Sequence, residues 1–274
     1  MVSSGPVGSH DRPCPSLITV IYLWGIFLSP TASKSKEKAL LHNVLFYLSG
    51  DLSRPHPHRT IHCIQAEVLL SSYYLKNGKT LEGKHHAEVA LSLAIGRGFH
   101  RIRSSRAPLP SQPPNSNSLT VPADVVEEGE RIDAFWAAVS LNSCWSALQE
   151  SHLTFSDLQH DVVDTPWPLD SYQHDSVRTL SSLVSPSVDA FLNQHHLPRK
   201  SLLSLQEFLN GSSVTGISEK ALYIKATILL ARAISVHRAD NGMFQGSISP
   251  RNSKSNILFK DHLLAMKSSP ASTR

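Results

Sequence analysis

Cysteine is scarce in this sequence, with three residues in a chain of 274. Cys14, Cys63 and Cys144 are odd in number and far apart, which excludes a small scaffold stapled by disulfides. Structural zinc sites use close pairs such as Cys-x-x-Cys, because such a pair fixes two corners of the tetrahedron at once. The spacing therefore predicts no zinc cluster. Unpaired thiols are more typical of the nucleus or cytoplasm than of a secreted protein.

Long hydrophobic runs are also missing, since a membrane-spanning helix needs ~20 apolar residues. The most hydrophobic run, from Leu17 to Leu28, is too short and ends at Ser29 and Pro30. Its length suits the hydrophobic region of a secretory signal peptide, but the residues before it carry one Arg and one Asp and are balanced in charge. We expect a buried first helix and no membrane contact, with a signal peptide as the alternative.

Neither sign of charge is in strong excess, because 26 Lys and Arg against 22 Asp and Glu give a net charge of +4. The basic residues lie mostly on expected helix ends and loop flanks in the N-terminal half. A groove that binds nucleic acid has denser cations, with aromatic residues between them for stacking on bases. The sequence therefore favours a solvated surface over direct nucleic-acid binding.

Helical periodicity is abundant, and no segment alternates as a β-strand does. With 41% hydrophobic residues the chain can bury a core, and we expect an all-α fold, an irregular multi-helix bundle. The pattern predicts helices over 17–28, 35–48, 60–75, 80–95, 127–148, 177–184, 188–192, 201–209 and 218–236.

Three of these helices carry more specific expectations. The helices 60–75 and 80–95, joined by the turn Lys-Asn-Gly-Lys, form an antiparallel hairpin with Thr80 as N-cap. The helix 127–148 is apolar on most sides and is therefore central. On the helix 35–48 we expect a buried stripe of Leu40, Leu41, Val44, Leu45 and Leu48, with Gly50 as the helix end. On the helix 218–236 we expect a buried stripe of Ala221, Ile224, Ile228, Ala231 and Ile234, with Ser218 as the N-cap.

Composition divides the chain into one helical domain over 15–240 with less ordered ends. Residues 1–14 are expected to be disordered, and 241–274 to be a weakly ordered tail with one weak helix near 257–266. Residues 104–124 are rich in Ser, Pro and Asn, so burial cannot offset their ordering entropy. We expect a disordered insertion there, because helical patterns continue on both sides.

Histidine-rich stretches raise a metal hypothesis, with His56, His58 and His62 as the densest set. His58 and His62 are one helical turn apart, but no acidic residue completes a His-Glu-x-x-His pattern, which favours solvated or capping histidines. The adjacent His85 and His86 point ~100° apart on a helix and do not ligate one ion together.

Signals for catalysis are equally weak. The chain has no Gly-x-Ser-x-Gly elbow, and Cys63 and Cys144 fall in apolar helices. Gly96-x-Gly98 follows a helix and lacks the third glycine of a dinucleotide fingerprint. The acidic residues near Glu127 begin a helix, where the dipole favours them. We therefore expect no enzymatic activity.

Arg131 stands out because it begins a helix that is otherwise expected to be buried. Glu130 and Asp133 do not share its face. One hypothesis is that Arg131 binds a carboxylate from another element, since a buried arginine needs a partner. The alternative is an exposed arginine that pairs loosely with nearby acids.

Three segments together resemble a known family. They are IQAEVLLSSYYLKNGKTLEGKHHAEVALSLAIGRGFHRI (64–102), GERIDAFWAAVSLNSCWSAL (129–148) and the DTPWPLD that ends at Asp170. Their order and spacing resemble the fungal-specific transcription factor domain, the regulatory middle region of binuclear zinc-cluster activators and repressors of the xylanolytic type. The resemblance covers about residues 15–240.

The family pattern is a helix pair ending in Gly-Leu-His-Arg, a variable loop, an Arg-x-x-x-Trp helix and a short segment with Asp and Pro. Here Phe99 replaces Leu in the first element, and the second has one extra residue of spacing. The residues that match the family motifs, and are expected to be structural, are Gly98, His100, Arg101, Arg131, Trp136, Trp145, Asp164, Pro166, Trp167 and Pro168.

The resemblance implies a non-enzymatic nuclear protein that regulates RNA polymerase II genes. It also implies a DNA-binding Zn₂Cys₆ cluster, but two zinc ions need six cysteines, so no zinc-ligand role carries over to Cys14, Cys63 or Cys144. We expect no cofactor in this chain, and DNA binding only through a zinc-cluster domain that it lacks. Either a longer protein supplies that cluster, or the chain works without its own DNA reader.

The family's middle region is thought to act through inhibition, effector sensing or dimer contacts. The partners implied are therefore a second copy or transcriptional co-regulators. One hypothesis places Trp136 and Trp145 beside an effector pocket, whereas the interpretation we favour is that both fill the core. A different class of function stays open: a secreted or membrane-tethered metal-dependent hydrolase with His56, His58 and His62 as ligands.

Overall fold

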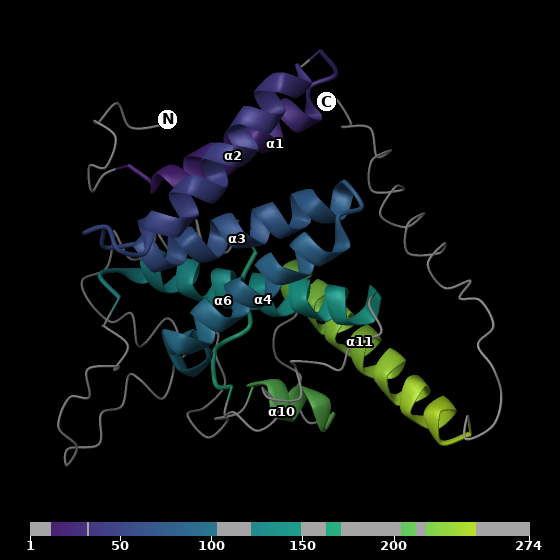
Figure 1. The fold of residues 1–274 in the computed structure, drawn as a ribbon. Helices are drawn as coiled ribbons and strands as arrows, with labels where there is room; N and C mark the ends of the chain where they lie inside the picture. Colours follow the sequence, from purple (N-terminus) through teal and green to yellow (C-terminus); the bar gives the residue numbers. More distant parts are fainter. Residues whose placement is uncertain are drawn as a thin grey trace, which may run out of the picture.

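A computed structural model describes residues 12–31, 33–102, 122–148, 163–170, 204–211 and 218–244, without the side chains of 239–244. No strand occurs in these ranges, which confirms the all-α fold (Figure 1). The elements are α1 (Pro15–Leu28), α2 (Lys34–Asp51), α3 (Arg59–Lys76), α4 (Thr80–Gly96), the 3₁₀ helix η1 (Phe99–Arg101), α6 (Val125–Leu148), α10 (Ser204–Leu209) and α11 (Glu219–Phe244).

Several predicted features fall outside these ranges. They are the helices expected over 177–184 and 188–192, most of the insertion at 104–124, and the tail after residue 244 with its expected helix at 257–266.

The first helix is buried on one side only. Val20 and Leu23 of α1 are inaccessible to solvent and pack against α2 and α3, whereas Ile21 and Tyr22 are exposed. The expectation of a buried first helix therefore holds for one face. Among the described helices, none combines the length and the apolar character needed to span a bilayer.

Helices α3 and α4 form the predicted antiparallel hairpin. Gly78 ends α3 with a φ of 70°, a left-handed conformation that glycine adopts without steric cost. The N–H of Lys79 donates to the carbonyl of Tyr74, and the N–H of Gly78 to that of Leu75, which satisfies the last carbonyls of α3. The turn therefore follows from the Asn-Gly pair seen in the sequence.

Helix α6 is central, as its apolar pattern predicts. It contacts α3, α4, η1 and α11, and in Figure 1 it runs below α3 and crosses α4. Its indole and phenyl side chains, Phe135, Trp136 and Trp145, are buried. Acidic residues stand in its first turn, where they stabilise the positive end of the helix dipole.

Two apolar clusters lie on opposite sides of α3. Ile61 and Ile64 of α3 face α4, α6 and α11, whereas Ala66 and Leu70 face α1 and α2. Burying an aliphatic side chain of this size contributes ~1.5–3 kcal/mol. A helix buried on two opposite sides therefore holds the two groups of helices together.

Helix α11 packs on α6 through the predicted stripe, of which Ala221, Ile224, Ile228 and Ala231 are buried and Ile234 is only partly buried. Beyond this stripe α11 extends away from the other helices (Figure 1). The helix runs to Phe244, so the expected end at Val236 is too early. The end expected at Gly50 is also too early, because α2 continues to Asp51.

Three more expectations on element ends and faces are corrected. Residues 12–14 belong to the segment expected to be disordered, but the structure describes them, and Cys14 is buried and precedes α1 as its N-cap. Thr80 is the first residue of α4, and Lys79 is the N-cap. In the stripe expected on α2, Leu45 is exposed, Val44 is fully buried, and Leu40, Leu41 and Leu48 are partly buried.

Candidate functional site

Gly98 redirects the chain at the end of α4. Its φ of 76° is left-handed, and its N–H donates to the carbonyl of Ile95 at 2.8 Å, which closes the helix. The following residues form η1, in which Phe99 and His100 are buried. Arg101 is exposed. The first of the three motifs is thus a helix stop that turns two side chains inward.

The third motif packs directly on the first. The N–H of Asp164 donates to the carbonyl of His100 at 3.0 Å, and the Thr165 hydroxyl donates to the carbonyl of Phe99. Both Asp164 and Thr165 are fully buried. Residues 163–170 have no regular secondary structure, as the prolines in this segment predict, so their polar backbone groups need such partners.

Trp136 of α6 joins the second motif to the third. Its indole N–H donates to the carbonyl of Pro166 at 2.6 Å, and its ring stacks on Trp167 with 4.2 Å between centroids. Phe208 of α10 meets Trp167 edge-on. The buried ammonium of Lys225 in α11 lies 4.8 Å from the centre of the Trp167 ring, and burial lowers the pKa of this lysine.

The same segment caps α11. The Ser218 hydroxyl donates to the carbonyl of Pro168, and its oxygen accepts the N–H of Ala221, so Ser218 is the predicted N-cap. The carboxylate of Asp170 accepts the N–H groups of Glu219 and Lys220. We call residues 98–101, 131–136 and 163–170 the helix junction, because they connect η1, α6 and α11.

Arg131 lies in the helix junction and is buried, as the first hypothesis requires, and one of its partners is a carboxylate of its own helix. Its guanidinium binds Glu127 at 2.6 Å, one turn earlier on α6, and faces the ring of Phe99. Burial alone would raise the pKa of Glu127, but the N–H of Ala123 and the Arg131 charge outweigh it and lower that pKa. The i,i+4 spacing makes this pairing local to α6.

Trp145 lies apart from the helix junction. Its indole N–H donates to the Ser71 hydroxyl at 2.8 Å, and Ser71 donates to the carbonyl of Gly83 at 2.6 Å. A Cβ at Gly83 would overlap the Trp145 ring. Trp136 and Trp145 are both fully buried with satisfied N–H groups, which supports the interpretation that they fill the core.

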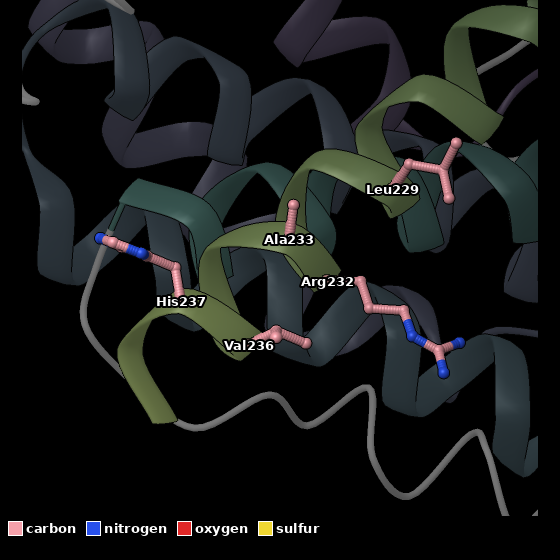
Figure 2. A pocket seen from close by; sticks show the side chains of 5 residues that line it. All are labelled: Leu229, Arg232, Ala233, Val236 and His237. Carbon is pink, nitrogen blue, oxygen red and sulfur yellow. The ribbon is translucent and has the colours of Figure 1, made fainter. Parts of the chain in front are cut away.

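A surface pocket lies elsewhere, on α11. Figure 2 shows its five lining side chains, Leu229, Arg232, Ala233, Val236 and His237, all on this one helix. Leu229 and Val236 are each about half exposed. The pocket is therefore an open hollow, and it includes neither tryptophan proposed for effector binding.

A second gathering of polar side chains lies where α1 begins. Cys14, His56 and His62 bring one ligand atom each within 4.8 Å of the others. The N–H of Cys14 donates to Nδ1 of His62 at 3.3 Å. Burial and the neighbouring His56 and His58 lower the pKa of His62 to about 4, so its imidazole is neutral at pH 7.

The sequence suggested two of these three residues but not Cys14. His58, the third member of the predicted set, lies 3.8 Å from the carboxylate of Glu127. Burial raises the pKa of the Cys14 thiol to about 11 and that of Cys63 to about 12. Burial likewise raises the pKa of Cys144 to about 11. All three thiols are therefore protonated at neutral pH.

Comparison of the chain with family models, curated proteins and solved structures finds no match.

Proposed function

We propose that this chain is a regulatory, non-enzymatic helical domain of a transcription factor of the fungal zinc-cluster type. It acts in the nucleus on RNA polymerase II genes through a second copy or transcriptional co-regulators. DNA and zinc binding of the family kind come from a zinc cluster outside this chain.

The observation that carries this proposal is the helix junction. The three segments that carry the family resemblance are distant in sequence, yet they contact one another through His100 with Asp164 and through Trp136 with Pro166. Their contact supports reading the three motifs as parts of one structural unit.

A reporter assay tests the regulatory role. The chain is fused to a foreign zinc-cluster DNA-binding domain and expressed in a fungal host with a reporter gene under the matching DNA site. We expect reporter expression to rise or fall severalfold relative to the DNA-binding domain alone. Trp136→Ala should abolish this effect, whereas Leu81→Ala, on an exposed side chain, should preserve it. An unchanged reporter with a stable nuclear fusion contradicts the proposal.

The transcript supplies an independent test. We expect an in-frame Cys-x-x-Cys-x₆-Cys cluster upstream of Met1 if a longer protein carries the DNA reader. Mapping the 5′ end of the transcript shows whether such a reading frame exists.

A further inference from the structure

Three protein segments meet at the N-terminal end of α1. Cys14 immediately precedes this helix, His56 lies in the connection between α2 and α3, and His62 stands in the first turns of α3. Cys14 and His56 are buried, and His62 is partly buried. The thiol and the two imidazoles therefore form a compact group shielded from bulk water.

We propose that Cys14, His56 and His62 bind one zinc ion, with water as the fourth ligand. The site would be a metal site of this chain itself, unrelated to the zinc cluster of the family. It revises the expectation that this chain has no cofactor and that no cysteine is a metal ligand. The proposal does not depend on the proposed regulatory function.

The separation of the ligand atoms suits zinc after a small adjustment. Zn–S bonds of ~2.3 Å and Zn–N bonds of ~2.0–2.1 Å place tetrahedral ligand atoms about 3.3–3.6 Å apart. The present maximum of 4.8 Å requires inward movement of roughly 1 Å, which side-chain rotation provides. A mixed thiolate and imidazole set also suits zinc better than calcium or magnesium, which prefer oxygen ligands.

The backbone around two of the ligands is stiff. Cys14 stands between Pro13 and Pro15, and His56 stands between Pro55 and Pro57. Each proline ring fixes its own φ, so the chain loses little further freedom when a ligand binds. The prolines therefore hold the ligands in place before the metal arrives.

The two ring nitrogens of His56 contact different backbone groups. Its Nε2 lies 3.1 Å from the carbonyl of Arg12, and its Nδ1 accepts the N–H of His58. An imidazole N–H bound to a backbone carbonyl is the usual outer contact of a metal-binding histidine. On binding, zinc would take the place of the His58 N–H at Nδ1 of His56. At Nδ1 of His62 it would take the place of the Cys14 N–H.

Charge around the group also suits a cation. Binding converts the Cys14 thiol to a thiolate and releases one proton, and the ion with this thiolate keeps a charge of +1. The buried carboxylate of Asp51 accepts the N–H of Ser16, two residues from Cys14, and its charge opposes ionisation of the Cys14 thiol in the absence of metal. Asp51 is also paired with Arg54 at 2.8 Å, so with zinc present its charge would be shared between Arg54 and the remaining charge of the ion.

Cobalt substitution tests the site in the full chain. Under reducing conditions, Co²⁺ should give a sulfur-to-cobalt charge-transfer band that saturates at one ion per chain and disappears when Zn²⁺ is added. Cys14→Ser should remove this band, and the matched Cys144→Ser should keep it. His62→Gln should weaken binding by more than the ~10–100-fold typical of outer-contact losses, whereas His85→Gln should not.

X-ray absorption of the zinc-loaded wild-type chain avoids reliance on variants that fail to fold. We expect one sulfur at ~2.3 Å, with nitrogen or oxygen atoms at ~2.0–2.1 Å in the remaining positions. A shell without sulfur, a shell with two sulfurs, or a cobalt band that survives Cys14→Ser overturns the proposal. None of these results alters the reporter assay, so the two proposals fail separately.

Discussion

The indole rings of Trp136 and Trp167 stack with 4.2 Å between centroids and 17° between planes. One ring comes from the central helix α6 and the other from the irregular segment 163–170. Trp136 also donates to the carbonyl of Pro166, so the ring pair and the hydrogen bond hold the segment to the helix. This relationship connects two of the three segments on which the proposed function rests.

The tryptophan stack has a spectroscopic signature. Two indoles this close should couple and give a paired positive and negative band in circular dichroism. Trp136→Phe should remove this couplet and destabilise the chain by about 1–3 kcal/mol, because the Pro166 carbonyl loses its donor. Trp24→Phe is the control, since Trp24 also donates to a backbone carbonyl, that of Leu69, and lies edge-on to its aromatic neighbours. A couplet that persists in Trp136→Phe would contradict the stacking.

The contact of Gly83 with Trp145 predicts opposite effects of alanine at two helical glycines. Gly83→Ala should destabilise by about 1–3 kcal/mol, because the added methyl group overlaps the Trp145 ring. Gly25→Ala should stabilise by about 0.5–1 kcal/mol, because nothing lies within 4 Å of its Cβ position and alanine favours the helix. Urea unfolding measures both, and equal effects would contradict the close contact.

The buried pair of Arg131 and Glu127 predicts a large cost when its cation is lost. Arg131→Met should destabilise by about 3–5 kcal/mol, because Glu127 would keep a charge in a mostly buried position. Lys34→Met removes the exposed partner of Glu37 and should cost less than about 1 kcal/mol. Thermal unfolding of both variants gives the comparison. Unchanged stability in Arg131→Met would remove the structural role of this pair.

Glu67 and His86 connect α3 to α4 inside the hairpin. His86 Nδ1 lies 2.6 Å from the Glu67 carboxylate, and the His86 ring stacks on Tyr74. Glu67→Ala should cost roughly 2–3 kcal/mol, because a buried imidazole nitrogen loses its partner. Glu88→Ala, which breaks a more exposed pair with Lys84, should cost about 0.5 kcal/mol. Similar denaturant midpoints for the two variants would contradict the burial of the first pair.

Acid should weaken the contact between α2 and α3. The Tyr73 hydroxyl donates to Glu37 at 2.6 Å and holds the pKa of that carboxyl below its ordinary value of 4.5. The ionised form therefore adds stability above pH 4.5, and this stability is lost as pH falls through the lower, folded-state pKa. When the free energy of unfolding is measured against pH, Tyr73→Phe should reduce the loss of stability in acid. Tyr22→Phe, on an exposed ring, should leave this loss unchanged.

Local patterns along the chain are enough to predict most helices and several of their ends and turns. The apolar repeat predicted α6 as a central helix, Gly78 marked the hairpin turn, and Ser218 marked the start of α11. These features depend on residues within one or two turns of each other. Errors were confined mainly to helix ends, where the last turns depend on side chains that arrive from elsewhere.

Contacts between distant segments were outside the reach of such patterns. The contact of the Arg131 guanidinium with the Phe99 ring joins α6 to η1, and no spacing in the sequence indicates it. The sequence spacing does not predict that Cys14 lies beside His56 and His62, because the packing of α1 on α3 brings these residues together. The periodicity of a helix shows which face is apolar, whereas side-chain packing between helices selects which faces meet.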